Sequence, residues 1–74
     1  MYSVVNRRKM GKICQENRKR DGWTQAEIAL DIGCDIRCIS QFESGYTTSW
    51  RVLSWYMLNG YLDKDIVRGC ARYA

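Results

Sequence analysis

The sequence predicts an all-α fold, a single domain of five helices over residues 1–74. The chain contains no proline and six glycines, and it is 46% hydrophobic and 27% charged. This balance is typical of a small globular protein rather than a disordered one, and the lack of proline favours uninterrupted helices. Apolar residues also recur at steps of three and four, which is the period of an α-helix. A chain of this length encloses one small core.

The first helix is expected over residues 10–20, behind a basic N-terminal arm at residues 1–9. Met10, Ile13 and Cys14 follow the i, i+3, i+4 pattern of a helix face. An Asp-Gly pair directly after this stretch ends the helix. The pattern does not fix the conformation of the arm.

Residues 24–45 predict two short helices joined by a tight turn. Thr24 can cap the first of them, and Glu27 can accept a hydrogen bond from the Thr24 backbone in return, which makes a capping box. Gly33 tolerates the positive φ that ends this helix. Asp35 then offers an N-cap for the second helix. The stretch is therefore interpreted as a helix-turn-helix unit.

Two C-terminal helices are expected over residues 49–74. Ser49 or Thr48 caps the fourth helix, and an Asn-Gly pair at 59–60 ends it. Apolar stripes at helical spacing mark both elements. In the fourth helix the stripe consists of Trp50, Leu53, Met57 and Leu58, and Trp55 and Tyr56 widen it. In the fifth helix it consists of Leu62, Ile66, Cys70 and Tyr73.

The helix-turn-helix unit carries a set of residues in the order of a known family and without a gap: Thr24, Gln25, Ile28, Ala29, Gly33, Ile39, Ser40, Phe42, Glu43 and Gly45. The unit resembles the Cro and phage-repressor class of helix-turn-helix proteins, also called the XRE class. The resemblance implies a lambda-repressor-like DNA-binding domain. It also implies that Arg18 pairs with Glu43 and so joins the first helix to the end of the third.

The resemblance places the second helix of the unit, about residues 35–43, in the major groove of DNA. Such a helix presents its N-terminal, outward residues to the base edges. Arginine can pair with guanine, glutamine with adenine, and an aliphatic side chain can touch a thymine methyl group. The candidates for base readout are Ile36, Arg37, Ser40 and Gln41. A plain solvated helix face is the alternative, and the resemblance favours readout.

Seven residues are candidates for contacts to DNA phosphates: Gln25, Arg7, Arg8, Lys9, Lys12, Thr47 and Thr48. Gln25 matches the family position that contacts a phosphate, and the N-terminus of a helix attracts anions. The basic residues can grip the DNA backbone or reach the minor groove, as basic arms do. The alternatives are a solvated basic face and an ordinary loop.

The charge distribution leaves a second function open. The net charge is +4, yet residues 21–50 hold one basic and five acidic side chains, whereas residues 1–20 hold seven basic and one acidic. If the protein binds DNA, the basic segments on either side of the acidic helix-turn-helix unit would therefore have to neutralise the phosphates. An interaction or inhibitor protein that binds a protein partner through the same scaffold is the alternative.

Catalytic and metal chemistry are not expected. The chain has no histidine, and its four cysteines lack the C-x2-C spacing of common zinc modules. Cys14, Cys34, Cys38 and Cys70 are expected to be reduced and mostly buried. No nucleophile and base can be combined from the residues of the motif. The protein is thus expected to be no enzyme and to need no cofactor.

Together these features predict a sequence-specific transcriptional regulator of phage or mobile-element type, a repressor or Cro-like protein that binds operator DNA as a homodimer. Apolar residues in the C-terminal third exceed what a small core encloses, and they predict the dimer interface: Trp55, Tyr61, Leu62 and Ile66. A fifth helix that folds back and completes the monomer's core is the alternative. The sequence shows neither a membrane span nor a secretion signal, so we expect a cytoplasmic protein.

Overall fold

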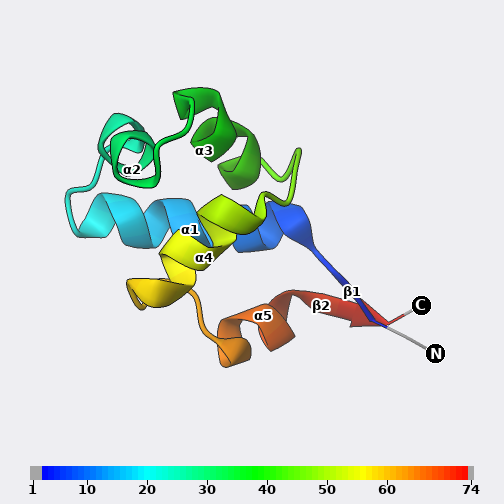
Figure 1. The fold of residues 1–74 in the computed structure, drawn as a ribbon. Helices are drawn as coiled ribbons and strands as arrows, with labels where there is room; N and C mark the ends of the chain where they lie inside the picture. Colours follow the sequence, from blue (N-terminus) through cyan, green and yellow to red (C-terminus); the bar gives the residue numbers. More distant parts are fainter. Residues whose placement is uncertain (1–2, 74) are drawn as a thin grey trace.

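The computed structural model describes residues 3–73 and confirms the all-α class (Figure 1). Its five helices are α1 (Arg7–Arg20), α2 (Gln25–Ile32), α3 (Ile36–Glu43), α4 (Trp50–Leu58) and α5 (Lys64–Cys70). The helices α2 and α3 lie on one side of α1, α4 crosses in front of it, and α5 lies on the opposite side (Figure 1). Two short strands, β1 (Ser3–Val5) and β2 (Ala71–Tyr73), pair antiparallel, with Val4 opposite Arg72.

Both ends of the described chain differ from the expectation. The first helix begins at Arg7 rather than at Met10, because Asn6 caps α1 by accepting a hydrogen bond from the Lys9 backbone N–H at 3.2 Å. The basic cluster at residues 7–9 is therefore the first turn of a helix. At the other end, the expected fifth helix of residues 61–74 is shorter, since its last residues leave the helix and hydrogen-bond with β1.

The boundaries of the helix-turn-helix unit are confirmed. The Thr24 hydroxyl accepts from the Glu27 backbone N–H at 3.1 Å, and the Glu27 carboxylate accepts from the Thr24 backbone N–H at 3.0 Å. Gly33 has a φ of 83°, which lets the chain turn at the end of α2. Asp35 caps α3 by accepting from the Arg37 backbone N–H at 2.8 Å.

Thr24→Ala is expected to lower the free energy of unfolding by about 0.5 to 2 kcal/mol, because the N3 amide of α2 loses its partner. The urea midpoint measures this change. Thr48→Ala is the control, since Thr48 is exposed and makes no side-chain hydrogen bond within the described chain. Equal midpoints for the two variants would mean that the capping box does not stabilise the start of α2.

The core gathers side chains from α1 to α4 and from the segment before α5. Its buried members are Met10, Cys14, Ile28, Ala29, Ile39, Phe42, Val52, Trp55, Tyr56, Tyr61 and Leu62. On α4 the buried face carries Val52, Trp55 and Tyr56, whereas Trp50, Met57 and Leu58 of the predicted stripe are exposed. The two rings fit inside because their polar atoms have partners: the Trp55 indole N–H donates to Asp31 at 2.6 Å, and the Tyr56 hydroxyl donates to Glu43.

At Gly11, α1 and α3 touch backbone to backbone. A Cβ atom at this buried position would lie 2.5 Å from the carbonyl oxygens of both Phe42 and Glu43. A second close approach follows α3, where a Cβ on Gly45 would lie 2.7 Å from the Arg8 Cα. The C-terminal end of α3 is thus held directly against the first two turns of α1.

Candidate nucleic-acid interface

The four residues predicted to read bases all lie on the exposed face of α3: Ile36, Arg37, Ser40 and Gln41. Ile39 and Phe42 occupy the opposite face and are buried in the core. The first two turns of the helix are therefore available to a partner. This arrangement follows from the strong separation of apolar and polar residues around α3.

The Arg37 side chain lies beside the cap of its own helix. Its Nε is 3.4 Å from Asp35 Oδ1, and the Arg37 side chain is 81% exposed. The hydrogen bond from the Arg37 backbone N–H, and then that from its side chain, lower the pKa of Asp35. Such an exposed ion pair contributes little free energy in water, so the guanidinium can leave Asp35 and bind another acceptor.

A polar groove of about 450 Å³ lies between α1, the start of α2 and the C-terminal half of α3. Its lining residues are Arg8, Lys12, Gln15, Gln25, Ser40, Glu43 and Ser44. Arg8 and Lys12 are four residues apart and therefore share one face of α1. The structure thus brings two of the predicted phosphate-binding cations next to Ser40, a predicted base reader.

The Gln25 side chain is turned toward α3 rather than away from the protein. Its amide N–H donates to Glu43 Oε1 at 3.0 Å. Gln25 is the first residue of α2, where backbone N–H groups have no partner inside the helix. The backbone at Gln25 can therefore still face an anion in the polar groove, while its side chain fixes α2 against α3.

Four other predicted phosphate contacts lie outside the polar groove. Arg7 and Thr48 line a different hollow, together with Trp50 on α4. The Lys9 ammonium group donates to the Gly69 carbonyl oxygen at 2.9 Å, and Thr47 is half-buried in the loop after α3. The expectation of one basic arm is wrong because neighbouring residues of a helix point in directions about 100° apart.

Arg18 and Glu43 form the buried ion pair that the resemblance implies. Arg18 Nε lies 2.7 Å from Glu43 Oε2, and Arg18 Nη2 lies 2.9 Å from Glu43 Oε1. The two side chains are only 6% and 1% exposed. Burial by itself would raise the pKa of Glu43, but hydrogen bonds from Arg18, Tyr56 and Gln25 outweigh it and lower that pKa.

Tyr56 is a member of this cluster that the sequence did not indicate. Burial, followed by the hydrogen bond to Glu43, raises the pKa of the Tyr56 hydroxyl far above its ordinary value. The hydroxyl is therefore a permanent donor. A buried carboxylate such as that of Glu43 needs several hydrogen-bond donors, so a further donor could have been expected. The sequence does not indicate which aromatic residue supplies it.

The cysteines are distributed as small buried or half-buried side chains. Cys14 lies in the core, while Cys34 and Cys38 are half-buried around the start of α3. Burial, and then the proximity of Cys38, raise the pKa of the Cys34 thiol. Among the described residues, no three His, Cys, Asp or Glu side chains gather as metal ligands would. The Cys70 side chain lies outside the described residues.

The predicted dimer interface is wrong. Trp55, Tyr61 and Leu62 are 7%, 8% and 1% exposed, and Ile66 packs half-buried against the same core. The segment before α5 is held on α1 by Asn17, whose amide donates to the Tyr61 carbonyl oxygen at 3.0 Å. These apolar residues complete the core of the monomer, which is the alternative that the sequence left open.

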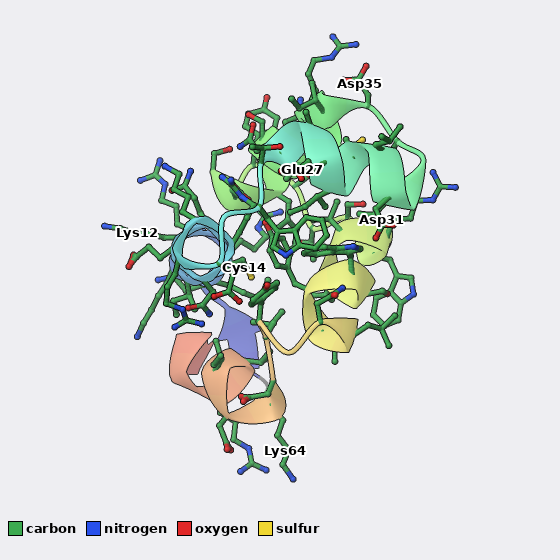
Figure 2. All side chains as sticks on the ribbon, turned by 90° about the vertical axis from the view of Figure 1, so that its left-hand side faces the viewer. Lys12, Cys14, Glu27, Asp31, Asp35 and Lys64 are labelled. Carbon is green, nitrogen blue, oxygen red and sulfur yellow. The ribbon has the colours of Figure 1, made fainter. Side chains whose placement is uncertain are left out.

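Comparisons with protein-family models, with curated proteins and with solved structures found no match to this chain. None of the helices described has both the length and the continuous apolar surface that a bilayer crossing requires. The site is therefore defined by its own geometry. It consists of the exposed face of α3 and the polar groove beside it. Figure 2 shows Lys12 on the outer side of α1 and Asp35 at the outer end of the helix-turn-helix unit.

Proposed function

We propose that this protein is a sequence-specific regulator of transcription that binds double-stranded DNA, with α3 in the major groove. The observation that carries the proposal is the position of Arg8 and Lys12 in the polar groove beside α3. Phosphate contacts fix the position of a protein on DNA, and contacts to base edges select the sequence. The groove and the exposed face of α3 are neighbouring surfaces suited to these two tasks.

Within this proposal the residues have distinct roles. Arg37 and Gln41 have the side chains that pair bidentately with guanine and adenine, Ile36 can touch a thymine methyl group, and Ser40 tolerates either base. Arg8, Lys12 and the backbone N–H at Gln25 contact phosphates. As a small repressor or Cro-like protein of phage or mobile-element type, it would act on operator DNA in the cytoplasm.

The five acidic side chains of residues 21–50 are compatible with this proposal, because each one has a partner inside the protein. Asp21 pairs with Arg20, Glu27 belongs to the capping box, Asp31 accepts from Trp55, Asp35 pairs with Arg37, and Glu43 pairs with Arg18. Only Asp35 belongs to the end of α3 that faces the bases (Figure 2). Glu43 does line the polar groove, but its carboxylate is buried and paired with Arg18, so a phosphate in the groove would not meet an unpaired negative charge.

Arg37→Ala and Lys12→Gln are expected to weaken DNA binding in different ways. Loss of Arg37 should cost about 1 to 3 kcal/mol on a preferred duplex and little on a random one. Loss of Lys12 should weaken both complexes alike and reduce the slope of log K against log salt by about 0.9. A duplex selected from a random pool, titrated over a salt series, provides the measurement.

Lys19→Gln is the matched control for this experiment. It removes the same charge from the same helix at an exposed position outside the polar groove, so the salt slope should stay unchanged. Equal losses from Arg37→Ala on selected and random DNA would contradict its role in readout. A chain that binds no duplex even at low salt would contradict the whole proposal.

Binding of a protein partner is the second candidate function. Its support is the exposure of large apolar side chains outside the predicted DNA contacts: Tyr46 is 76% exposed and Leu58 86%. Aromatic residues are enriched in protein interfaces. The same titration separates the two functions, because a regulator loses affinity for DNA steeply with salt.

A further inference from the structure

An apolar hollow of about 300 Å³ lies between α1, α4 and α5. Its lining residues are Arg7, Met10, Thr48, Trp50, Leu53, Met57 and Val67. The inner wall belongs to the core, because Met10 is 3% exposed and both Leu53 and Val67 pack half-buried against the same cluster. Trp50 and Met57 form the outer wall and are 73% and 47% exposed. The packing of three helices therefore determines where this hollow lies.

Two hydrogen-bond donors border the apolar hollow, and neither has a partner in the described part of the chain. They are the Arg7 guanidinium and the Thr48 hydroxyl, both on exposed side chains. The loop that carries Thr48 is held against the first turn of α1, because a Cβ on Gly45 would lie 3.1 Å from the Arg7 carbonyl carbon. Figure 1 shows this loop passing beside the start of α1. Both donors therefore belong to the same end of the hollow.

The charge at this end favours an anionic group. Arg7 is the one charged side chain among the residues that line the apolar hollow. The first turn of α1 also holds basic residues and no acidic one, although the N-terminus of a helix favours negative charge. A guanidinium binds a carboxylate through two parallel hydrogen bonds. A carboxylate on an otherwise apolar ligand therefore matches both the cation and the wall.

The rest of the wall favours a flat aromatic body. The Trp50 indole offers a ring for offset or edge-to-face packing. Met10 and Met57 add thioether sulfurs, which contact aromatic rings favourably and adapt to the shape of a ligand. A dry cavity of about 150 Å³ holds one benzene ring. The apolar hollow, with about twice that volume, has room for about two fused rings.

We propose that the apolar hollow binds a small aromatic monocarboxylate of about two rings. The carboxylate accepts hydrogen bonds from the Arg7 guanidinium and the Thr48 hydroxyl and stays at the exposed end of the hollow. The rings pack against Trp50 and Met57 and cover the core side chains behind them. Ligand sites are typically concave and mostly apolar, with a few polar groups that fix the orientation of the ligand, and the hollow has this composition.

This ligand site goes beyond the proposed function and does not rest on it. The apolar hollow shares no residue with the polar groove or with the predicted base readers. Arg7 and Thr48 were expected to contact DNA phosphates. A sugar-phosphate backbone would not supply the apolar surface that the wall of the hollow needs in order to exclude water. These two residues therefore have a different task from Arg8 and Lys12.

An amide NMR titration of the full chain with β-naphthoate, without DNA, tests the site. Saturable one-to-one binding is expected with a dissociation constant of about 0.02 to 1 mM, the range for a ligand of about 13 non-hydrogen atoms. The shifted signals should belong to residues that line the apolar hollow. Arg7→Gln should raise the dissociation constant about tenfold or more, because the carboxylate loses its charged partner. Trp50→Ala should raise it about threefold or more.

Two matched controls lie on α4 but do not line the apolar hollow. Arg51→Gln removes the same charge as Arg7→Gln, and Leu58→Ala removes an exposed apolar side chain as Trp50→Ala does. Neither control should change the affinity by more than about twofold. Octanoate, an aliphatic carboxylate, should bind more weakly than β-naphthoate. Circular dichroism should show the same helix content in all variants, since each replaced side chain is exposed.

Every outcome decides for or against the ligand site. Binding that Arg7→Gln and Trp50→Ala weaken, and that the two controls leave unchanged, supports it. The absence of saturable binding in the millimolar range overturns it, and so does binding that survives either hollow variant or falls equally in a control. Octanoate that binds as tightly as β-naphthoate would overturn the assignment to an aromatic ligand. Because DNA is absent from the experiment, failure of the DNA proposal leaves this result unaffected.

Discussion

Glu43→Gln is expected to destabilise the protein by about 3 to 5 kcal/mol, because it leaves the buried Arg18 guanidinium without its charge partner. The free energy of unfolding in urea measures the loss. Glu16→Gln is the control, since Glu16 is exposed on α1 and its loss should change little. A double-mutant cycle with Arg18→Met should show a coupling energy, and its absence would contradict the buried pair.

The same pair predicts how stability depends on pH. The pKa of Glu43 is lower in the folded protein than in the unfolded chain. The carboxylate therefore contributes stability above the unfolded-state pKa, and this contribution disappears as the pH falls through the folded-state pKa. Glu43→Gln should remove this part of the acid dependence. An unchanged acid profile would show that Glu43 is not the responsible group.

Gly11→Ala is the second substitution with a large expected effect. The new methyl group would lie 2.5 Å from two carbonyl oxygens of α3, and backbone atoms cannot move aside as a flexible side chain can. Overpacking of this kind costs about 1 to 3 kcal/mol or more. Alanine in a helix gains back only about 0.5 to 1 kcal/mol relative to glycine. We therefore expect a net loss in the free energy of unfolding.

Gly69→Ala is the control that isolates the contact at Gly11. Gly69 is also helical, but a Cβ there meets no atom within 4 Å. Its replacement should leave stability unchanged or raise it slightly through helix propensity. If Gly11→Ala were as harmless as Gly69→Ala, then α1 and α3 would not approach as closely as the structure describes.

The parts of the fold that the sequence predicted correctly depend on local chemistry. A threonine three residues before a glutamate, a glycine at the end of a helix and an aspartate before the next one determine helix ends within a few residues. Their positions in the helix-turn-helix unit are confirmed. The Arg18–Glu43 pair is a long-range contact, and it was predicted only through the resemblance to a family.

The parts that the sequence could not predict depend on tertiary packing. On α4 apolar residues surround the helix, so periodicity could not tell which side is buried. The side was decided by Trp55 and Tyr56, whose polar atoms reach Asp31 and Glu43. Gly11 gave no signal either, because a single glycine inside a helical pattern has the same appearance whether or not another backbone lies against it.

The candidate site was predicted in part. The residues on the exposed face of α3 follow from a helix start at Asp35 and an inward Phe42. Four of the phosphate candidates were basic residues close together in the sequence, and the structure places only Arg8 and Lys12 of these four in the polar groove. This selection requires knowing that α1 begins at Arg7 and how α1 is rotated against α3, and neither follows from the count of basic residues.

The β1–β2 pairing has a consequence for the order in which the protein folds. Three-residue strands contribute few hydrogen bonds, yet joining them closes a loop that contains all five helices. The entropy cost of closing such a loop is small only after the helices have packed and brought the ends of the loop together. The strands should therefore pair last and separate first. Ser3–Val5 and Ala71–Tyr73, from opposite ends of the described chain, then behave as one cooperative unit, and shortening either end would release the other.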